Sequence, residues 1–173
     1  ACYSKMALGK SSGQYLFFYG LSGVAQTNIT ALQKSLRSAF EMQIVSPFPL
    51  CWPWVDAART VYPTPRKWLS LIRDASYVVT NSFHGTVFSV IWEKPFVVLE
   101  LQGNLGSRNN RMISLLKRLG LEDRLINVED RQAVIKTLNR PIDWEPVRKL
   151  LDEWRNEADA FFRELFRGAI GNL

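Results

Sequence analysis

The chain has 173 residues, of which 47% are hydrophobic, and this is enough for one compact core but too little for two full domains. Its formal net charge of +6 favours anionic partners, such as phosphates, carboxylates, nucleic acid or a membrane surface. The two cysteines have no CxxC or disulfide-rich spacing, which argues against a zinc site and against an oxidised scaffold.

The chain begins with ACYSKMALGKSSG, which has neither an initiator Met nor the basic, apolar and small-residue regions of a signal peptide. No window reaches the roughly 18 to 20 apolar residues that a membrane span needs. We therefore expect a cytoplasmic protein, and a fragment of a longer chain.

Four apolar runs are predicted to form strands. Their hydrophobicity is continuous rather than alternating, which is typical of strands buried on both faces of a parallel sheet. The runs are Tyr15–Tyr19, Met42–Val45, Tyr77–Thr80 and Phe96–Leu101.

Amphipathic segments between the runs are predicted to form helices, because each carries a capping or stop signal. They extend from a cap at Thr27 or Asn28 to about Phe40, from Thr64–Pro65 to Arg73, and from Asn110 to a stop at Gly120. Alternating strands and helices predict a Rossmann-like α/β fold, with a parallel sheet, helices on both faces and right-handed crossovers.

The segment SPFPLCWPWVDAARTVYPTP, residues 46–65, is rich in proline and is predicted to be a long loop. It contains Trp52 and Trp54. These side chains either form a recognition surface or pack on the core as a lid, and both interpretations stay open.

A long amphipathic helix is expected at residues 143–168, after an α/β core at 14–142, so that 1–173 form one domain. Between Asp143 and Arg167 the chain has seven acidic and five basic residues, which leaves +8 on the rest. A helix that lies on a membrane normally carries excess Lys and Arg. Docking against the core or against a missing domain is therefore the better interpretation.

The only histidine, His84, follows a predicted strand in the stretch TNSFHG. In open α/β sheets, ligands bind at the carboxyl ends of strands, where loops lead into helix N-termini. Asn81 and Ser82 are expected to cap the next helix, and Gly85 to allow a backbone or ligand to approach closely. The amides of Gly85 and Thr86 are expected to attract an anion.

An imidazole at this position can donate a proton, or can clamp a phosphate or carboxylate. The alternative is a structural histidine that satisfies a helix end. The strand-to-helix loop, the two capping residues and the glycine favour the functional interpretation, with His84 as the candidate catalytic residue.

The loop after the next strand, LELQGNLGSRNNR, leads to the same predicted edge of the sheet. Arg111 is expected on the first helical turn, where a guanidinium can hold a carboxylate or phosphate through two hydrogen bonds. Arg108 is either a second ligand or a solvated charge. Asn104 and Glu100 complete the candidate substrate-binding residues, and an acid at a strand end often binds a hydroxyl.

Other functional patterns are weak or absent. YGLSG at residues 19–23 matches neither nucleotide-binding glycine motif. Nothing brings Cys51 and His84 together as a nucleophilic pair. A single histidine without clustered carboxylates argues against a metal site, and the lack of a basic stripe with interleaved aromatics argues against nucleic-acid binding.

The stretch TPRKWLSLIRDASYVVTNSFHGTVFSVIWEKPFVVLELQGN, followed by RMISLLKRLGLEDR, resembles the C-terminal part of the polysaccharide pyruvyl transferase family. The resemblance extends from Tyr15 to about Arg124. It depends most on the order of three pieces, which are DASYVVTNSFHG, KPFVV and an Arg before LLKRLGL.

This resemblance implies the C-terminal domain of a two-domain enzyme of the GT-B glycosyltransferase kind, with an N-terminal domain of comparable size absent here. It implies transfer of the pyruvyl group of phosphoenolpyruvate to a saccharide or lipid-linked saccharide as a ketal. The setting it implies is bacterial capsule, exopolysaccharide or cell-wall polymer synthesis, without a cofactor, in the cytoplasm and at the inner face of the membrane through the acceptor.

By position, the family's motif histidine corresponds to His84, and its basic residue before LLKRLGL corresponds to Arg111. Many members have Arg-Leu-His-Gly where this chain has Ser82-Phe83-His84-Gly85. With Ser82 at this position, the chain lacks one guanidinium that the resemblance implies. Arg108 in the neighbouring loop is the candidate to supply it. Two alternatives remain, which are a GT-B glycosyltransferase with a nucleotide-sugar donor and a non-catalytic glycan-binding module.

Overall fold

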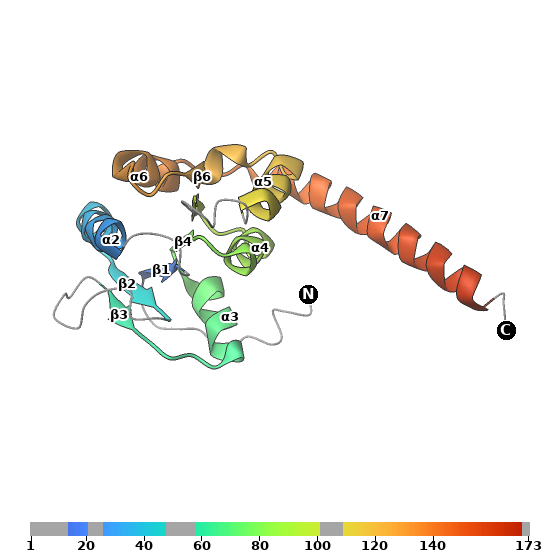
Figure 1. The fold of residues 1–173 in the computed structure, drawn as a ribbon, viewed down its shortest axis with the longest axis horizontal. Helices are drawn as coiled ribbons and strands as arrows, with labels where there is room; N and C mark the ends of the chain where they lie inside the picture. The colour runs from blue at the N-terminus through green and yellow to red at the C-terminus, as the bar shows by residue number, and fades with distance from the viewer. Residues whose placement is uncertain (1–13, 21–25, 48–57, 101–108, 171–173) are drawn as a thin grey trace.

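The computed structural model describes residues 14–20, 26–47, 58–100 and 109–170 (Figure 1). Six strands form one sheet in the order β3-β2-β1-β4-β5-β6, and every neighbouring pair is parallel. This confirms the predicted α/β class. The strands are β1 Tyr15–Tyr19, β2 Gln43–Ser46, β3 Arg59–Thr60, β4 Tyr77–Thr80, β5 Phe96–Leu99 and β6 Leu125–Ile126.

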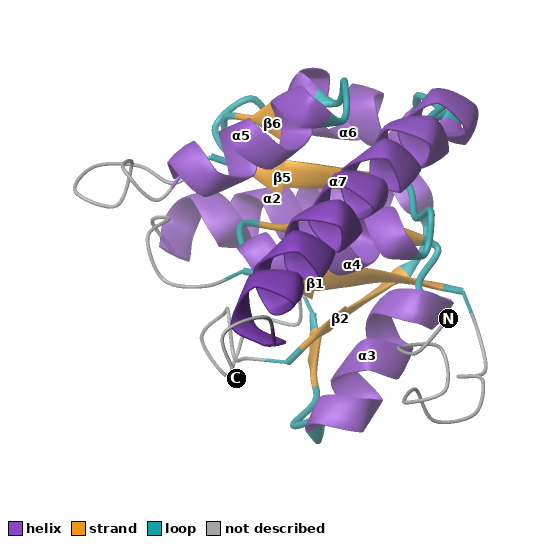
Figure 2. Cartoon of the chain, turned by 90° about the vertical axis from the view of Figure 1, so that its right-hand side faces the viewer, coloured by secondary structure: helices purple, strands orange, loops and turns teal. Residues whose placement is uncertain are grey.

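Helices cover both faces of the sheet. In Figure 2, α3, α4, α5 and α7 lie in front of the sheet, and α2 lies behind it. The helices are α2 Gln26–Phe40, α3 Pro65–Asp74, α4 Phe83–Ile91, α5 Asn109–Arg118, α6 Arg131–Asn139 and α7 Trp144–Ile170, with a short 3₁₀ helix at Glu122–Arg124.

Each face has its own hydrophobic core, because alternate strand residues point to opposite sides. Phe17 of β1 packs with residues of α3, α4, α5 and α7, whereas Phe18 packs with residues of α2 and α6. Both phenylalanine side chains are fully buried. The continuous apolar runs therefore belong to strands that are covered on both faces, as expected from the sequence.

The strand order reverses between β1 and β4, and this reversal positions the candidate site. In open α/β sheets, ligands bind beside the carboxyl ends of the strands where the order reverses. Tyr19 at the end of β1 is in register with Thr80 at the end of β4. The chain segment that contains His84 begins immediately after Thr80.

Two parts of the sheet were not expected from the sequence. Within the proline-rich segment predicted as a loop, Arg59 and Thr60 form β3 and pair with β2. Leu125 and Ile126 form β6 and pair with β5. Strands of two residues have no detectable periodicity, and pairing with an existing edge strand defines them. Trp52 and Trp54 lie outside the described residues.

The helix α7 differs along its length. Near its start, Val147 is 2% exposed and packs in the core, with Trp154 partly buried against the same cluster. Farther on, Phe161 and Phe166 are 62% and 60% exposed. Only the first part of α7 therefore docks as expected, and the rest extends away from the body (Figure 1). No helix within the described ranges is long and apolar enough to cross a membrane.

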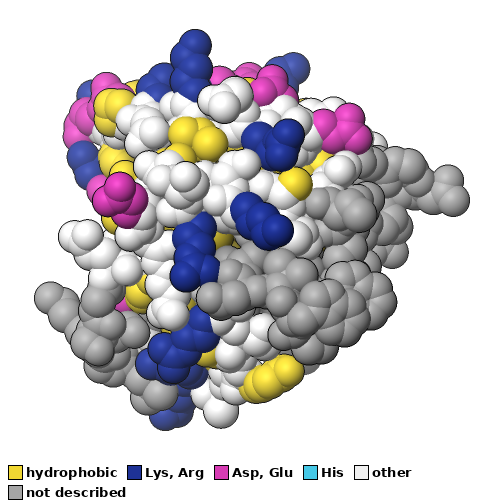
Figure 3. Space-filling model, turned by 90° about the vertical axis from the view of Figure 1, so that its left-hand side faces the viewer, with side chains coloured by type: hydrophobic (Ala, Val, Ile, Leu, Met, Phe, Trp, Pro, Cys, Tyr) yellow, Lys and Arg dark blue, Asp and Glu magenta, His cyan; other side chains and the backbone are white. Residues whose placement is uncertain are grey.

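Basic side chains gather on one face of the α/β body. Figure 3 shows Lys and Arg side chains running down the face on the α2 side of the molecule. The helix α2 contributes the exposed side chains of Lys34 and Arg37. The excess positive charge outside the last helix is thus presented on the surface of the body.

Candidate functional site

His84 lies in the first turn of α4, next to the carboxyl ends of β1 and β4. Its side chain is exposed, and the imidazole makes no hydrogen bond to another described residue. The first turn of α4 contains no acidic residue, so the positive end of the helix dipole is not neutralised there. Both ring nitrogens remain available for a proton or a ligand.

The turn between β4 and α4 is held by hydrogen bonds through Thr80. The Thr80 hydroxyl donates to the carbonyl of Tyr19 at 2.8 Å and accepts from the amide of Ser82 at 3.0 Å. These bonds join β1, β4 and the start of α4. The position of His84 is thus fixed by the two central strands of the sheet.

The expected capping by Asn81 and Ser82 is only partly right. Ser82 occupies the cap position, but its side chain makes no capping hydrogen bond. Both side chains are 3% exposed, so they do not present a polar surface to solvent. The Thr86 amide, which was expected to attract an anion, instead donates to the Ser82 carbonyl at 2.9 Å. The unpaired first-turn amides belong to the three residues before Thr86.

Gly85 is required by close packing rather than by a ligand. A Cβ atom at this position would lie 2.4 Å from the Thr80 hydroxyl oxygen, far closer than real contacts permit. The expected close approach therefore exists, but the approaching group is the side chain of Thr80. Gly85 allows α4 to begin directly against β4.

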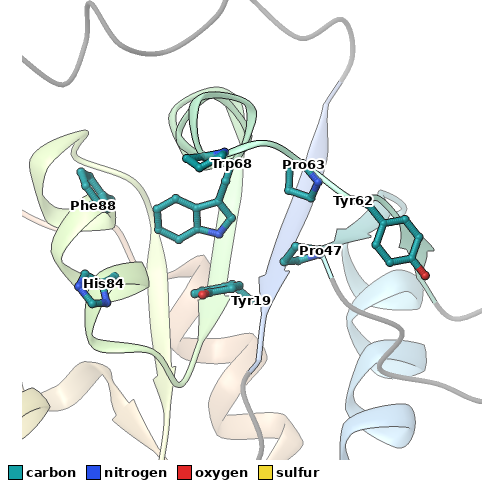
Figure 4. A pocket seen from close by; sticks show the side chains of 8 residues that line it. Tyr19, Pro47, Tyr62, Pro63, Trp68, His84 and Phe88 are labelled. Carbon is teal, nitrogen blue, oxygen red and sulfur yellow. The ribbon is translucent and has the colours of Figure 1, made fainter.

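His84 also lines a pocket of about 480 Å³, a volume typical of small-molecule sites. The other lining residues come from the ends of β1 and β2, from the segment before α3, and from α3 and α4. They are Tyr19, Pro47, Tyr62, Pro63, Pro65, Trp68 and Phe88 (Figure 4).

Three aromatic rings of this pocket pack against each other edge to face. Trp68 meets Tyr19 with ring centroids 5.1 Å apart and an interplanar angle of 69°, and meets Phe88 at 5.5 Å and 81°. In Figure 4 the nitrogen-bearing edge of the indole points toward Tyr19. The buried indole nitrogen of Trp68 makes no conventional hydrogen bond. The face of the tyrosine ring is its natural partner.

The helix α3 carries Trp68 into the pocket wall. As predicted, Thr64 caps this helix, accepting a hydrogen bond from the amide of Lys67 at 3.4 Å, and Pro65 occupies the first turn. Trp68 lies one turn farther along. A local capping signal in the sequence therefore positions a residue of the site.

Tyr19 links the pocket to the turn that carries His84. Burial raises the pKa of the Tyr19 phenol above its usual value, and a hydrogen bond from the Ser82 side chain opposes this shift. The phenol is thus neutral at physiological pH. The Ser82 side chain thus faces Tyr19 here.

Arg111 lies on the other side of α4, in the first turn of α5. Its guanidinium carbon is 5.5 Å from the centroid of the Phe83 ring, and the Phe83 and His84 rings are 6.0 Å apart in a T-shaped pair. Arg111 is exposed and makes no ion pair with another described residue. The structure thus brings Arg111 and His84 to the same aromatic ring, although Arg111 does not line the pocket.

The remaining predicted site residues have different outcomes. Glu100 follows β5 at the same edge of the sheet, and its amide donates to the Ile126 carbonyl at 2.9 Å. Asn104 and Arg108 lie outside the described residues, as do both cysteines. Within the described parts of the chain, no three His, Cys, Asp or Glu side chains form a group that could hold a metal ion.

Sequence reasoning missed the aromatic wall of the pocket. Tyr19 is the last residue of a correctly predicted strand, and the rule that ligands bind at strand ends was sufficient to single it out. Trp68 and Tyr62 had no such signal. They reach the pocket through the position of α3 beside α4, which is a consequence of tertiary packing.

Comparison with known proteins supports the resemblance noted in the sequence. The model of the family described as "Polysaccharide pyruvyl transferase" matches residues 31–103, which include β4 and the start of α4 with His84. No curated protein matches the chain.

Two solved structures share the fold. UDP-GlcNAc 2-epimerase of Methanocaldococcus jannaschii, in complex with UDP-GlcNAc and UDP, has a TM-score of 0.55 and 11% identity, and the match covers 90% of this chain and 47% of the epimerase. The glycotransferase of kitacinnamycin has a TM-score of 0.55 and 16% identity, with 92% and 48% covered. These neighbours have GT-B folds, and this chain spans about half of their length.

Proposed function

We propose that this chain forms the His84 side of an enzyme that transfers the pyruvyl group of phosphoenolpyruvate to a saccharide. The observation that carries the proposal is the position of His84. This exposed imidazole lies in the first turn of α4, at the strand-order reversal, inside the segment matched by the pyruvyl transferase family model. The proposed setting is the synthesis of a bacterial surface polymer in the cytoplasm.

The donor has two anionic groups, and the site offers two features that suit them. The amides at the start of α4 point outward at the positive end of the helix dipole, which favours a phosphate or carboxylate. Arg111 can bind the second anionic group through two parallel hydrogen bonds. The ring of Phe83 lies between these features and keeps them close.

In the proposed reaction, His84 donates a proton to the methylene carbon of phosphoenolpyruvate, which becomes a methyl group. The adjacent carbon becomes electrophilic, and one saccharide hydroxyl adds to it. Phosphate then leaves, and a second hydroxyl closes the cyclic ketal. The two hydroxyl protons end on the methyl group and on inorganic phosphate, so that His84 is reprotonated in each cycle. Phosphoenolpyruvate is thus a substrate, and no cofactor takes part.

The acceptor is proposed to be a saccharide or a lipid-linked saccharide. In the second case the enzyme would meet the inner face of the membrane through its substrate. Basic side chains on the face shown in Figure 3 suit an anionic surface of this kind.

Phosphate release tests the proposal. The complete protein is incubated with phosphoenolpyruvate and a panel of methyl glycosides, and inorganic phosphate is followed by ³¹P NMR. We expect phosphate release that depends on saccharide and is lost in His84→Ala. Undiminished release in His84→Ala, or none with any saccharide in the wild type, would overturn it.

A second candidate is a glycosyltransferase with a nucleotide-sugar donor. It is favoured by the GT-B fold, because one structural neighbour was solved with UDP-GlcNAc and UDP. A ligand that binds the folded state raises the melting temperature by mass action. A rise with UDP or GDP, together with no phosphate release from phosphoenolpyruvate, would select this candidate.

A further inference from the structure

Most of the residues that line the pocket beside His84 have no role in the proposed binding of the donor. Arg111 lies on the α5 side of α4, whereas the pocket lies on the α3 side. Among the residues that the structure describes, eight line the pocket, and none of these is Lys, Arg, Asp or Glu. Away from His84, a phosphate or carboxylate in this pocket would lose its hydration without gaining an ion pair with Lys or Arg, which is unfavourable. The pocket therefore suits an uncharged ligand.

The angles between the rings distinguish among uncharged ligands. A flat base binds well between parallel aromatic faces, but Trp68 stands at 69° to Tyr19 and at 81° to Phe88. Rings that meet at these angles suit a non-planar ligand better than a flat one. A pyranose ring has this shape, because one face presents C–H bonds that pack on the negative face of an aromatic ring.

The polar groups of the pocket match hydroxyls. The Tyr62 phenol and the His84 imidazole can each donate or accept a hydrogen bond, and neither has a hydrogen-bond partner among the described residues. A hydrocarbon chain would offer a hydrogen bond to neither group. A ligand with several hydroxyls instead provides a partner for each.

The pocket is also pre-organised. Pro47, Pro63 and Pro65 fix backbone dihedrals around it, and the packing of Trp68 on Tyr19 and Phe88 holds its wall. Less conformational freedom is then lost when a ligand binds. Tyr62 is 83% exposed at the rim, so its ring face is available without rearrangement.

We propose that this pocket is a saccharide subsite, in which a neutral pyranose ring packs on Trp68, with Tyr62 at the rim, and directs its hydroxyls toward His84. Its designation as the acceptor subsite rests on the proposed function. On that basis, His84 stands between the acceptor on the α3 side and the anionic donor on the α5 side. The binding of the sugar ring itself does not depend on any reaction.

Ligand-observed saturation-transfer NMR tests the subsite without turnover. The probes are methyl glycosides of glucose, galactose, mannose and N-acetylglucosamine, with uridine and 1-octanol as competitors of other chemistry. We expect saturation transfer to the C–H face of at least one glycoside. We expect about 3- to 10-fold weaker binding in Tyr62→Ser and a larger loss in Trp68→Leu.

Matched controls separate the pocket from general effects of losing an aromatic residue. Phe161→Ser removes an exposed aromatic ring of α7, and Trp144→Leu removes a tryptophan that packs on the same core outside the pocket. Both controls should bind the glycosides like the wild type. Glycoside binding that survives both pocket variants, or that is weaker than binding of uridine or octanol, would overturn the proposal.

The outcomes also separate the subsite from the proposed function. Glycoside binding that depends on Trp68 and Tyr62, without phosphate release from phosphoenolpyruvate, would retain the subsite and reject pyruvyl transfer. Release that depends on His84, with no effect of the pocket variants on glycoside binding, would do the reverse.

Discussion

The two sides of α4 differ in charge and in how they are built. Toward α3, the described wall of the pocket consists of aromatic rings and prolines, and none of its described residues is Lys, Arg, Asp or Glu. Toward α5, the exposed guanidinium of Arg111 lies over the ring of Phe83. His84 is in contact with both sides, as a lining residue of the pocket and as the ring neighbour of Phe83.

This difference matches the two substrates proposed above. A neutral saccharide gains from a rigid apolar wall, because its C–H face is packed and its hydroxyls remain free to react. An anionic donor gains from a helix N-terminus and an arginine. In the proposed arrangement, one helix start serves two ligands because its two neighbours differ in charge. Substitutions on either side should therefore have separable effects.

The largest effect is expected at the boundary between the two sides. His84→Ala should lower kcat for phosphate release by about 10²- to 10⁴-fold, the usual contribution of a general acid. Because the side chain is exposed, the melting temperature should stay unchanged. Initial rates at saturating substrates give kcat, and calorimetry gives the melting temperature. A loss of kcat that only follows a loss of folded protein would contradict the assigned role.

On the α5 side, Arg111→Gln should raise the KM for phosphoenolpyruvate by roughly 10- to 100-fold, as expected for a lost hydrogen bond to a charged group. The control is Arg131→Gln, which neutralises an exposed arginine at the start of α6. Steady-state kinetics at fixed saccharide measures both. Equal effects of the two substitutions would indicate only a general loss of positive charge.

Gly85→Ala tests the support of α4 itself. The added methyl group would meet the Thr80 hydroxyl at 2.4 Å, so we expect a loss of about 1–3 kcal/mol in the free energy of unfolding. Urea denaturation measures it. Gly120→Ala is a weaker comparison, because its strain comes from a φ of +66° and its Cβ would meet no neighbour. An unchanged stability in Gly85→Ala would remove the packing explanation for this glycine.

A smaller effect concerns Tyr19 on the pocket side. Because burial raises the pKa of its phenol in the folded state, this group contributes stability that is complete below the unfolded-state pKa near 10. That contribution is lost as the pH rises through the folded-state pKa. The melting temperature of the wild type should therefore fall more between pH 9 and pH 11 than that of Tyr19→Phe. The exposed Tyr62→Phe controls for general alkaline effects, and a parallel fall in all three proteins would argue against a buried phenol.

Most of the sheet and the position of His84 could be predicted from the sequence, because these features depend on local patterns. The run at Tyr15–Tyr19 and the run at Tyr77–Thr80 coincide with β1 and β4. The Thr64–Pro65 signature gave the start of α3. Once strands and helices alternate, the loop after a strand lies on the ligand edge of a parallel sheet.

The rest depends on packing between distant segments. Arg59–Thr60 becomes β3 only through pairing with β2. Tyr19 and Trp68 both line the pocket, although they are 49 positions apart in the sequence. They come together because α3 packs beside α4. Likewise, Gly85 seemed suited to a ligand because the sequence could not reveal that Thr80 occupies the adjacent space.

The most direct test of the account is a crossed measurement of KM values. The KM for phosphoenolpyruvate and the KM for the best saccharide are determined in Arg111→Gln and in Tyr62→Ser. We expect Arg111→Gln to raise only the first value, and Tyr62→Ser to raise only the second, by about 3- to 10-fold. If Tyr62→Ser raised the KM for phosphoenolpyruvate, or if each substitution raised both values equally, the separation of donor and acceptor by His84 would be contradicted.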